Sequence, residues 1–273
     1  MRLIPTAILA ALPGMTLAGS LTPPVADPVI VPVAPAPVIV PGNALRFTIG
    51  AGISGSPGYF GADEMEVGPT GTFRFEYLRF GSLEFGNPDP NAEDEGLSFG
   101  ASFRYVPERT SDDYAELDGL DDVDATFELG GSVAYTTPLY EVSAELRYGL
   151  GGHESFVAEL GADVFHRPTD RLELSLGPRL LMGDSDYART YFGVTEDEAG
   201  ASDFDAYDPQ GGLLTAGVEF GATYELTDLW GLEGNIRYDR YIGDAADSPI
   251  VQSESDDQVS LDLLVTRRFD FSF

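Results

Sequence analysis

The chain has 273 residues, no Cys, two His and a formal net charge of −31, and all 15 of its basic residues are Arg. Without Lys and Cys, the chain has no lysine Schiff base, thiol nucleophile, disulfide or thiolate metal site, and two His are too few for a His-rich zinc site. The large negative charge argues against nucleic acid as a partner, because phosphate binding requires an excess of positive charge. We therefore expect neither a cofactor nor a dedicated metal site.

The first 18 residues have the composition of a secretory signal. Arg2 precedes a short apolar run, and the small residue Ala18 ends the segment where a signal peptidase would cut. Two Pro interrupt this run, which falls short of the ~20 apolar residues that a spanning helix needs. Residues 19–43 are rich in Pro, which disfavours both helix and central strand. We expect residues 1–18 to be a cleaved signal peptide and residues 19–43 to be an extended periplasmic tether.

From residue 44 onward, apolar and polar residues alternate with a period of two, which is typical of strands with one apolar face. The polar faces carry Gly, Ser, Glu and Arg, often with opposite charges on one strand, as in Glu145 and Arg147. A closed membrane barrel turns its apolar side to lipid and fills a narrow lumen with small residues and paired charges. We therefore predict an all-β fold, an antiparallel transmembrane β-barrel over residues 44–273, with a soluble β-protein as the alternative.

The last strand carries the most specific sign of an outer-membrane barrel. Phe269, Phe271 and Phe273 share one face with four preceding aliphatic residues, and the chain ends on Phe273. Outer-membrane barrels present a terminal strand of this form to the barrel-assembly machinery, whereas a soluble protein would risk aggregation there. Arg267 interrupts this apolar face, and we expect its side chain to reach the membrane interface.

Connection lengths predict the number of strands, because such barrels have short periplasmic turns and long outer loops. Three tight turns are expected at residues 136–139, 166–170 and 226–229. The outer loops are then residues 57–66, 108–123, 152–155, 183–211 and 244–257, which hold most of the acidic excess. This arrangement gives ten strands. The count is twelve if Phe85 ends a short extra strand and Tyr187 to Val194 forms another.

The acidic residues of the outer loops suggest that these loops contact lipopolysaccharide phosphates through divalent cations.

Five short motifs, together spread over residues 45–273, resemble the MltA-interacting protein (MipA)/OmpV family of outer-membrane proteins. They include Gly58, Tyr59, Gly61 and Asp63 in the first outer loop, the segment Leu117-Asp118-Gly119-Leu120, Gly152 and His153, Tyr191, Phe192, Gly193 and Val194, and finally Ser248 and Pro249. The resemblance implies a barrel in the outer membrane. It also implies, for some members, a scaffold that links a lytic transglycosylase with a peptidoglycan synthase, and for others an adhesin. The Pro-rich tether departs from the family pattern.

One candidate for catalysis is the pair His153 and Ser155, whose spacing resembles that of outer-membrane lipid A deacylases. A strand would place both residues on one face. The alternative is a polar outer turn, which we favour because Phe165 and His166 stand where the orienting acid is expected. Acidic pairs such as Glu141 and Glu145 are interpreted as partners of Arg rather than as a glycosidase site.

The sequence therefore favours a non-enzymatic structural or scaffolding protein in the outer membrane over a channel. Ten strands enclose a lumen that charged side chains nearly fill, whereas open channels have about 16 to 18 strands. A small cation-preferring pore and a surface adhesin are the alternatives, and a deacylase-like enzyme is a remote one.

Overall fold

The computed structural model describes residues 42–89, 95–111 and 113–273. The predicted signal peptide and residues 19–41 of the predicted tether lie outside the described residues. The described part contains eleven strands: β1 (Ala44–Pro57), β2 (Met65–Phe80), β3 (Leu83–Gly86), β4 (Gly96–Val106), β5 (Thr126–Thr136), β6 (Tyr140–Gly151), β7 (Phe156–Thr169), β8 (Leu172–Gly183), β9 (Gly212–Glu225), β10 (Trp230–Tyr241) and β11 (Asp257–Ser272).

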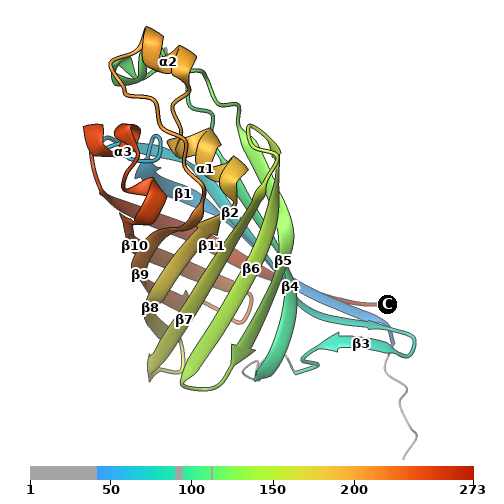
Figure 1. Cartoon of the computed structure of the whole chain (residues 1–273). Coiled ribbons are helices and arrows are strands. Elements are labelled where there is room, and N and C mark those ends of the chain that lie inside the picture. Colours follow the sequence, from blue (N-terminus) through green and yellow to red (C-terminus); the bar gives the residue numbers. More distant parts are fainter. Residues whose placement is uncertain (1–41, 90–94, 112) are drawn as a thin grey trace, which may run out of the picture. The chain divides into compact units, whose positions relative to one another are not determined.

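The strands form one antiparallel sheet that curls into a barrel (Figure 1). The sheet order is β3-β2-β1-β11-β10-β9-β8-β7-β6-β5-β4, so β1 and β11 join the two ends of the chain. Ten of the strands are long, and β3 is a four-residue extension paired with the end of β2. The predicted all-β antiparallel barrel is confirmed, with the ten long strands that the turns indicated.

The prediction of twelve strands is wrong in one of its two additions. The short strand that contains Phe85 exists as β3, but residues 187–194 belong mostly to a helix, α1 (Ser185–Phe192). Asp184 starts this helix, because its carboxylate accepts hydrogen bonds from the backbone N–H groups of Asp186 and Tyr187. The described residues contain two further short helices, α2 (Glu196–Ala201) and α3 (Pro249–Ser253). None of these helices is long and apolar enough to cross a bilayer.

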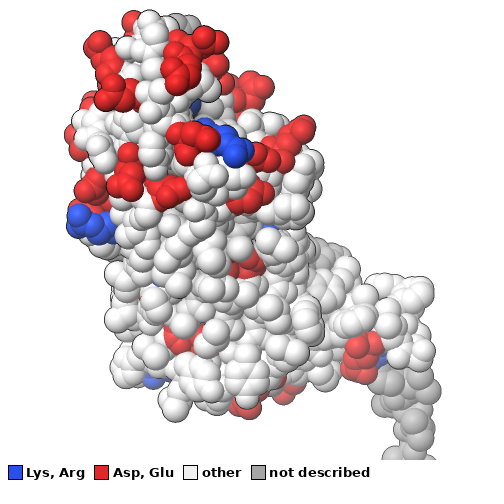
Figure 2. Space-filling view, viewed as in Figure 1, with Lys and Arg blue, Asp and Glu red and all other residues white. Residues whose placement is uncertain are grey.

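The barrel wall exposes apolar side chains and buries charged ones. Val164 is 60% exposed on the wall, whereas Glu128 and Arg147 in the lumen are 0% and 3% exposed. Figure 2 shows a wall that is mostly free of charge, below an end where acidic residues gather over α1 and α2. This distribution is the reverse of that in a water-soluble protein and fits a wall that contacts lipid.

Aromatic residues pack where β1 meets β11. Phe47 of β1 stacks on Phe269 and Phe271, with ring centroids 5.4 and 5.9 Å apart. The guanidinium of Arg267 lies over the rings of Trp230 and Phe269, at 5.0 and 4.9 Å from the centroids. These cation–π contacts explain how a charged residue fits into the apolar face of the last strand.

The two ends of the barrel differ in the length of their connections. The predicted tight turns lie at the end where β1 begins and β11 ends, and Thr137 N–H, for example, donates to the Tyr140 carbonyl at 2.8 Å. Five connections lie at the opposite end, at the positions predicted for outer loops; four of them are longer, whereas residues 152–155 form a turn of four residues. We call the described residues of 58–64, 107–125, 152–155, 184–211 and 242–256 the cap.

Candidate functional site

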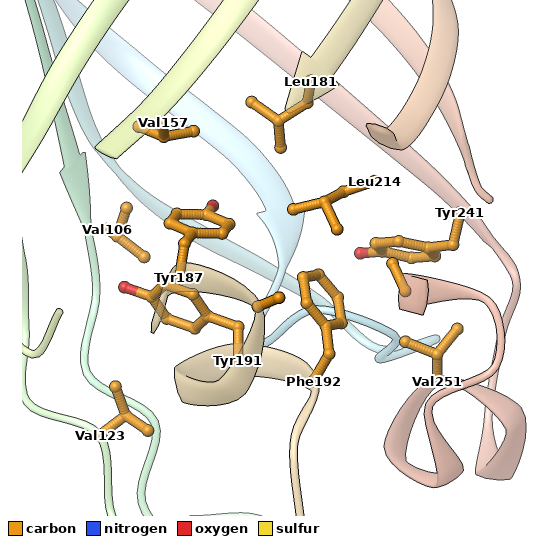
Figure 3. Close-up of a cluster of buried hydrophobic side chains, with 12 residues drawn as sticks. Val106, Val123, Val157, Leu181, Tyr187, Tyr191, Phe192, Leu214, Tyr241 and Val251 are labelled. Carbon is orange, nitrogen blue, oxygen red and sulfur yellow. The ribbon is translucent and has the colours of Figure 1, made fainter. Parts of the chain in front are cut away.

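The cap covers one end of the barrel with two buried apolar clusters. The first lies above the strand ends and combines α1 side chains with residues of β7, β8, β9, β10 and α3 (Figure 3). Its centre is Phe192, which is fully buried and packs edge-on against Tyr241 at 5.8 Å. The second cluster joins Tyr59, Val194 and Ile250 with Leu117 and Leu120. Segments far apart in the sequence thus form one closed structure.

The structure brings most family-motif positions together in this cap, where they take part in packing. Gly61 has a φ of +103°, its N–H donates to the Tyr241 hydroxyl at 3.1 Å, and a Cβ there would lie 2.9 Å from the Val251 Cα. Ser248, just before the first residue of α3, Pro249, donates its hydroxyl hydrogen to the Phe192 carbonyl at 2.7 Å. The close backbone approach and positive φ therefore require Gly at position 61, and the Ser248 hydroxyl links the start of α3 to the end of α1.

The remaining motif positions also have identifiable surroundings. A Cβ on Gly58 would lie 2.1 Å from the Tyr114 hydroxyl, and one on Gly152 would lie 1.8 Å from the Asp124 carbonyl oxygen. Gly193 follows α1, and its N–H donates to the Arg189 carbonyl. Asp63 differs from the others because its side chain is exposed.

His153 lies at the base of the cap in a buried hydrogen-bonded array. Its Nδ1 is 2.8 Å from the Ser155 hydroxyl, and its Nε2 is 3.2 Å from a carboxylate oxygen of Glu128. The rings of Tyr187 and Tyr191 pack edge-on against the imidazole at 5.0 and 5.5 Å. The acid that completes the array is therefore Glu128 of β5, and not a residue at Phe165 or His166, the positions where the sequence pattern places an orienting acid.

Sequence reasoning missed Glu128 because it lies 25 residues before His153 and contacts it only through the pairing of β5 with β6. In that pairing Glu128 is opposite Gly149, which leaves space for the imidazole above the glycine. The register of two adjacent strands, counted from the Thr136–Tyr140 turn, was the signal that could have located it.

The array has the groups of a hydrolase triad but lacks access for a substrate. Ser155 is 2% exposed, and neither Ser155 nor His153 lines either of the two cavities described below. Glu128 also accepts hydrogen bonds from Arg104 at 2.6 Å and from Arg147 at 2.9 Å. These two cations compensate the charge of Glu128. The array is therefore suited to a structural role, as a buried hydrogen-bonded support beneath the cap.

A chain of ion pairs crosses the lumen below the cap. Arg147 of β6 pairs with Glu128, Glu145 and Glu159. Glu159 of β7 also pairs with Arg237 of β10, which lies three strands away, so this contact spans the interior.

A second pair, Arg74 of β2 with Glu233 of β10, spans the interior in the same way. The predicted pairing of Glu145 with Arg147 is confirmed. Asp163 of β7 pairs with Arg179 of β8 at 2.9 Å.

Two cavities among the described residues lie inside the barrel and bear on function. The larger, about 910 Å³, reaches from β2 and β4 to β9, β10 and β11. The smaller, about 460 Å³, lies among charged residues that include Arg74, Asp163 and Arg179. In the part of the chain that the structure describes, no three acidic or histidine side chains form a group able to hold a metal ion.

Burial and hydrogen bonding shift the pKa values of several cap residues. Burial raises the pKa of the Tyr187 and Tyr191 hydroxyls. Burial also acts to raise the pKa of Glu198, but hydrogen bonds from the backbone N–H groups of Thr195 and Asp121 outweigh it and hold that pKa below its usual value. The ionised Glu198 therefore helps to join α2 to the loop before β5.

The model of the family described as MltA-interacting protein MipA matches residues 49–269. The chain belongs to this family. The family assignment and the apolar wall of the nearly closed antiparallel barrel place the protein in the outer membrane. No curated protein matches the chain.

Solved outer-membrane structures are also similar to the chain. Neisserial surface protein A is 13% identical, with 82% of this chain and 97% of that chain covered and a TM-score of 0.28. OprG from Pseudomonas aeruginosa is 11% identical, with 85% and 99% covered and a TM-score of 0.26. The NanC porin is 9% identical, with 82% and 98% covered and a TM-score of 0.33.

Proposed function

We propose that the protein is a non-enzymatic scaffold that holds peptidoglycan-remodelling enzymes at the outer membrane, a lytic transglycosylase first and a peptidoglycan synthase with it. The family description, which names an interaction with MltA, supports this choice of partner. The observation that carries the proposal is the obstruction of the lumen along the barrel axis. The cap covers one end and ion pairs cross the interior, so the surfaces left for function are those that meet other molecules.

The end where β1 begins and β11 ends offers a suitable contact surface for a periplasmic enzyme. There β2 and β3 form a hairpin that extends beyond the barrel body (Figure 1). Phe80, Leu83 and Phe85 of this hairpin are 61%, 48% and 56% exposed. Beyond its pairing with β2, β3 is the end strand of the sheet, and such an edge can accept an added strand from a partner. We assign this hairpin as the docking site of the transglycosylase.

Photo-crosslinking in intact envelopes tests the proposal. A photoreactive amino acid at Leu83 or Phe85 should give covalent products that contain a lytic transglycosylase. The same amino acid at Asp197 on α2, at the opposite end, serves as the matched control and should give none. If neither hairpin position captures a peptidoglycan enzyme while the protein is folded and abundant, the scaffold proposal is wrong.

A hydrolase is the second candidate, because His153, Ser155 and Glu128 are arranged as a catalytic triad requires. The burial of Ser155 opposes it. We expect a fluorophosphonate probe to leave the folded protein unlabelled, with Ser155→Ala as the control. Labelling of the native protein that disappears in this variant would establish the hydrolase instead.

A further inference from the structure

The barrel wall has a seam between β2 and β4. The sheet begins with β3 and β2 and ends with β4, and in the described residues β4 pairs only with β5. β3 covers only the end of β2, from Tyr77 to Phe80, so residues 65–76 of β2 have a partner strand on one side alone. Unpaired backbone groups are costly in lipid, so a break in the ladder at this point needs a reason.

The larger cavity opens through this seam. On β9, β10 and β11 it contacts only alternate residues, such as Arg237 and Asp239, because only the lumen-facing side chains line it. On β2 it contacts seven consecutive residues, Glu66 to Thr72, and on β4 four consecutive residues, Phe103 to Val106. A cavity can contact both faces of a strand only where it passes around the edge of that strand. The seam is therefore a lateral opening from the lumen to the lipid-facing surface.

The residues at the opening leave it unobstructed. A Cβ built on Gly68 meets no atom within 4 Å, although Gly68 lies in the middle of a barrel strand and has ordinary φ. Pro69, next to it, has no N–H and so exposes no donor to the hydrocarbon. On the outer side, Val67, Phe103 and Tyr105 are 75%, 49% and 54% exposed. The outer side of the entrance is thus apolar, whereas Glu66, which also lines the cavity, accepts a hydrogen bond from the Tyr114 hydroxyl at 2.7 Å.

The inner end of the opening holds two incompletely satisfied cations. The Nε of Arg104 is buried and has no hydrogen-bond partner. Arg109 is 7% exposed, and among the described residues no carboxylate lies within ion-pair distance of it; its guanidinium donates only to the carbonyls of Tyr191 and Asp121, at 3.4 Å each. Both residues line the cavity. Arg is well suited to bind a planar anionic group.

We propose that this cavity binds a single-chain amphiphile with an anionic head group, which enters from the membrane between β2 and β4. Its apolar chain occupies the opening beside Val67 and Phe103, and its head group meets Arg104 and Arg109. The cavity volume of about 910 Å³ lies within the usual range for small-molecule sites. The cap and the crossing ion pairs are unchanged, so this is a binding site in the wall and not a pore.

A blocked opening tests the route. The chain has no Cys, so Gly68→Cys introduces a single thiol that is alkylated with a bulky maleimide after the protein has folded in nanodiscs. A dansyl-labelled long-chain carboxylate should bind the unalkylated variant and bind at least about tenfold more weakly after alkylation. Gly200→Cys in α2, where a Cβ also meets no atom within 4 Å, is the matched control and should bind equally before and after. Equal binding by alkylated Gly68→Cys would overturn the route.

Probes of equal chain length test the head group. Carboxylate and phosphate head groups should both bind, and their ratio distinguishes a fatty acid from a lipid-derived phosphate as the source. Neutral and cationic head groups should bind at least about tenfold more weakly. The variant Arg109→Gln, if it keeps its heat-dependent gel mobility, should lose this preference for anions. If none of the probes binds, or if all head groups bind equally well, the proposal is overturned.

Discussion

Glu128→Gln removes one buried negative charge from the lumen while keeping the size of the side chain. The carboxylate is fully buried and accepts hydrogen bonds from Arg104 and Arg147, and it lies 3.2 Å from His153. The neutral amide of Gln cannot compensate the positive charges of two guanidinium groups. Its NH2 group is a hydrogen-bond donor, and it would face the N–H donors of these groups. The substitution should therefore strongly destabilise the folded barrel.

The expected magnitude follows from the partners that remain. Breaking a buried ion pair costs about 3–5 kcal/mol when one charge stays uncompensated. Arg147 keeps Glu145 and Glu159 as partners, whereas Arg104 has no other carboxylate among its contacts in the described residues. We therefore expect the free energy of unfolding to fall by about 3 kcal/mol, at the lower end of this range. With a slope of about 2 kcal/mol per M, the urea midpoint should fall by about 1.5 M.

Trp230 provides the assay, because it is the only Trp of the chain and lies on the barrel wall, 42% exposed. Its fluorescence reports urea unfolding from lipid vesicles. The matched control is Glu154→Gln, which changes an exposed residue in the turn beside His153 and should leave the midpoint unchanged. A midpoint for Glu128→Gln within error of the wild type would refute the view that compensated buried charges stabilise the interior.

Three further predictions concern the cap, the β1–β11 junction and assembly. Because the pKa of Glu198 is lowered on folding, its stabilisation is complete above the usual glutamate pKa of about 4.3 and is lost as the pH falls through the lower folded value. The protection of the α2 amides against hydrogen exchange, relative to the intrinsic rate at each pH, should therefore fall on acidification, and less so in Glu198→Gln. Gly52→Ala would place a Cβ 1.8 Å from the Leu263 carbonyl oxygen and should prevent folding, measured by heat-dependent gel mobility, whereas Gly68→Ala should fold normally. Deletion of Phe273 should reduce the assembled fraction in envelopes several-fold; unchanged assembly would remove the role assigned to the terminal aromatic residues.

The barrel wall was predictable from sequence because each strand is subject to one local rule. A residue that faces lipid is apolar and its neighbours face the lumen, so alternation such as that around Glu145 and Arg147 identifies a strand without knowledge of its partners. Turn and loop lengths then order the strands. This reasoning located ten long strands and all five outer connections.

The cap was not predictable in the same way, because its stability comes from contacts between distant segments. The segment 187–194 is short and rich in aromatic residues, a composition that fits a strand as well as a helix. Only the spacing of Tyr187, Ala188, Tyr191 and Phe192, which places them on one buried face, indicates a helix. The Thr195–Glu198 capping box was a readable sign of α2. The approach of Glu128 to His153 depends on strand register, which no single segment encodes.

Pro69 is a sign of the seam in the sequence, but it can be interpreted only with the pairing of the strands. Pro69 lies within a strand pattern, and Pro in a strand indicates an edge. A barrel that closes completely has no edge, so Pro69 could be interpreted only once β2 and β4 were known to lack a shared ladder.

Single-channel recording in planar bilayers tests the closed lumen most directly. The cap lies over one end of the barrel, and ion pairs join β2 to β10 and β7 to β10 across the interior. From these obstructions we infer that the lumen has no continuous aqueous path along the barrel axis. We expect the full-length folded protein to give no steady current at any applied voltage that the bilayer tolerates. Large, stable, cation-selective currents from the same preparation would contradict the closed lumen and favour the pore.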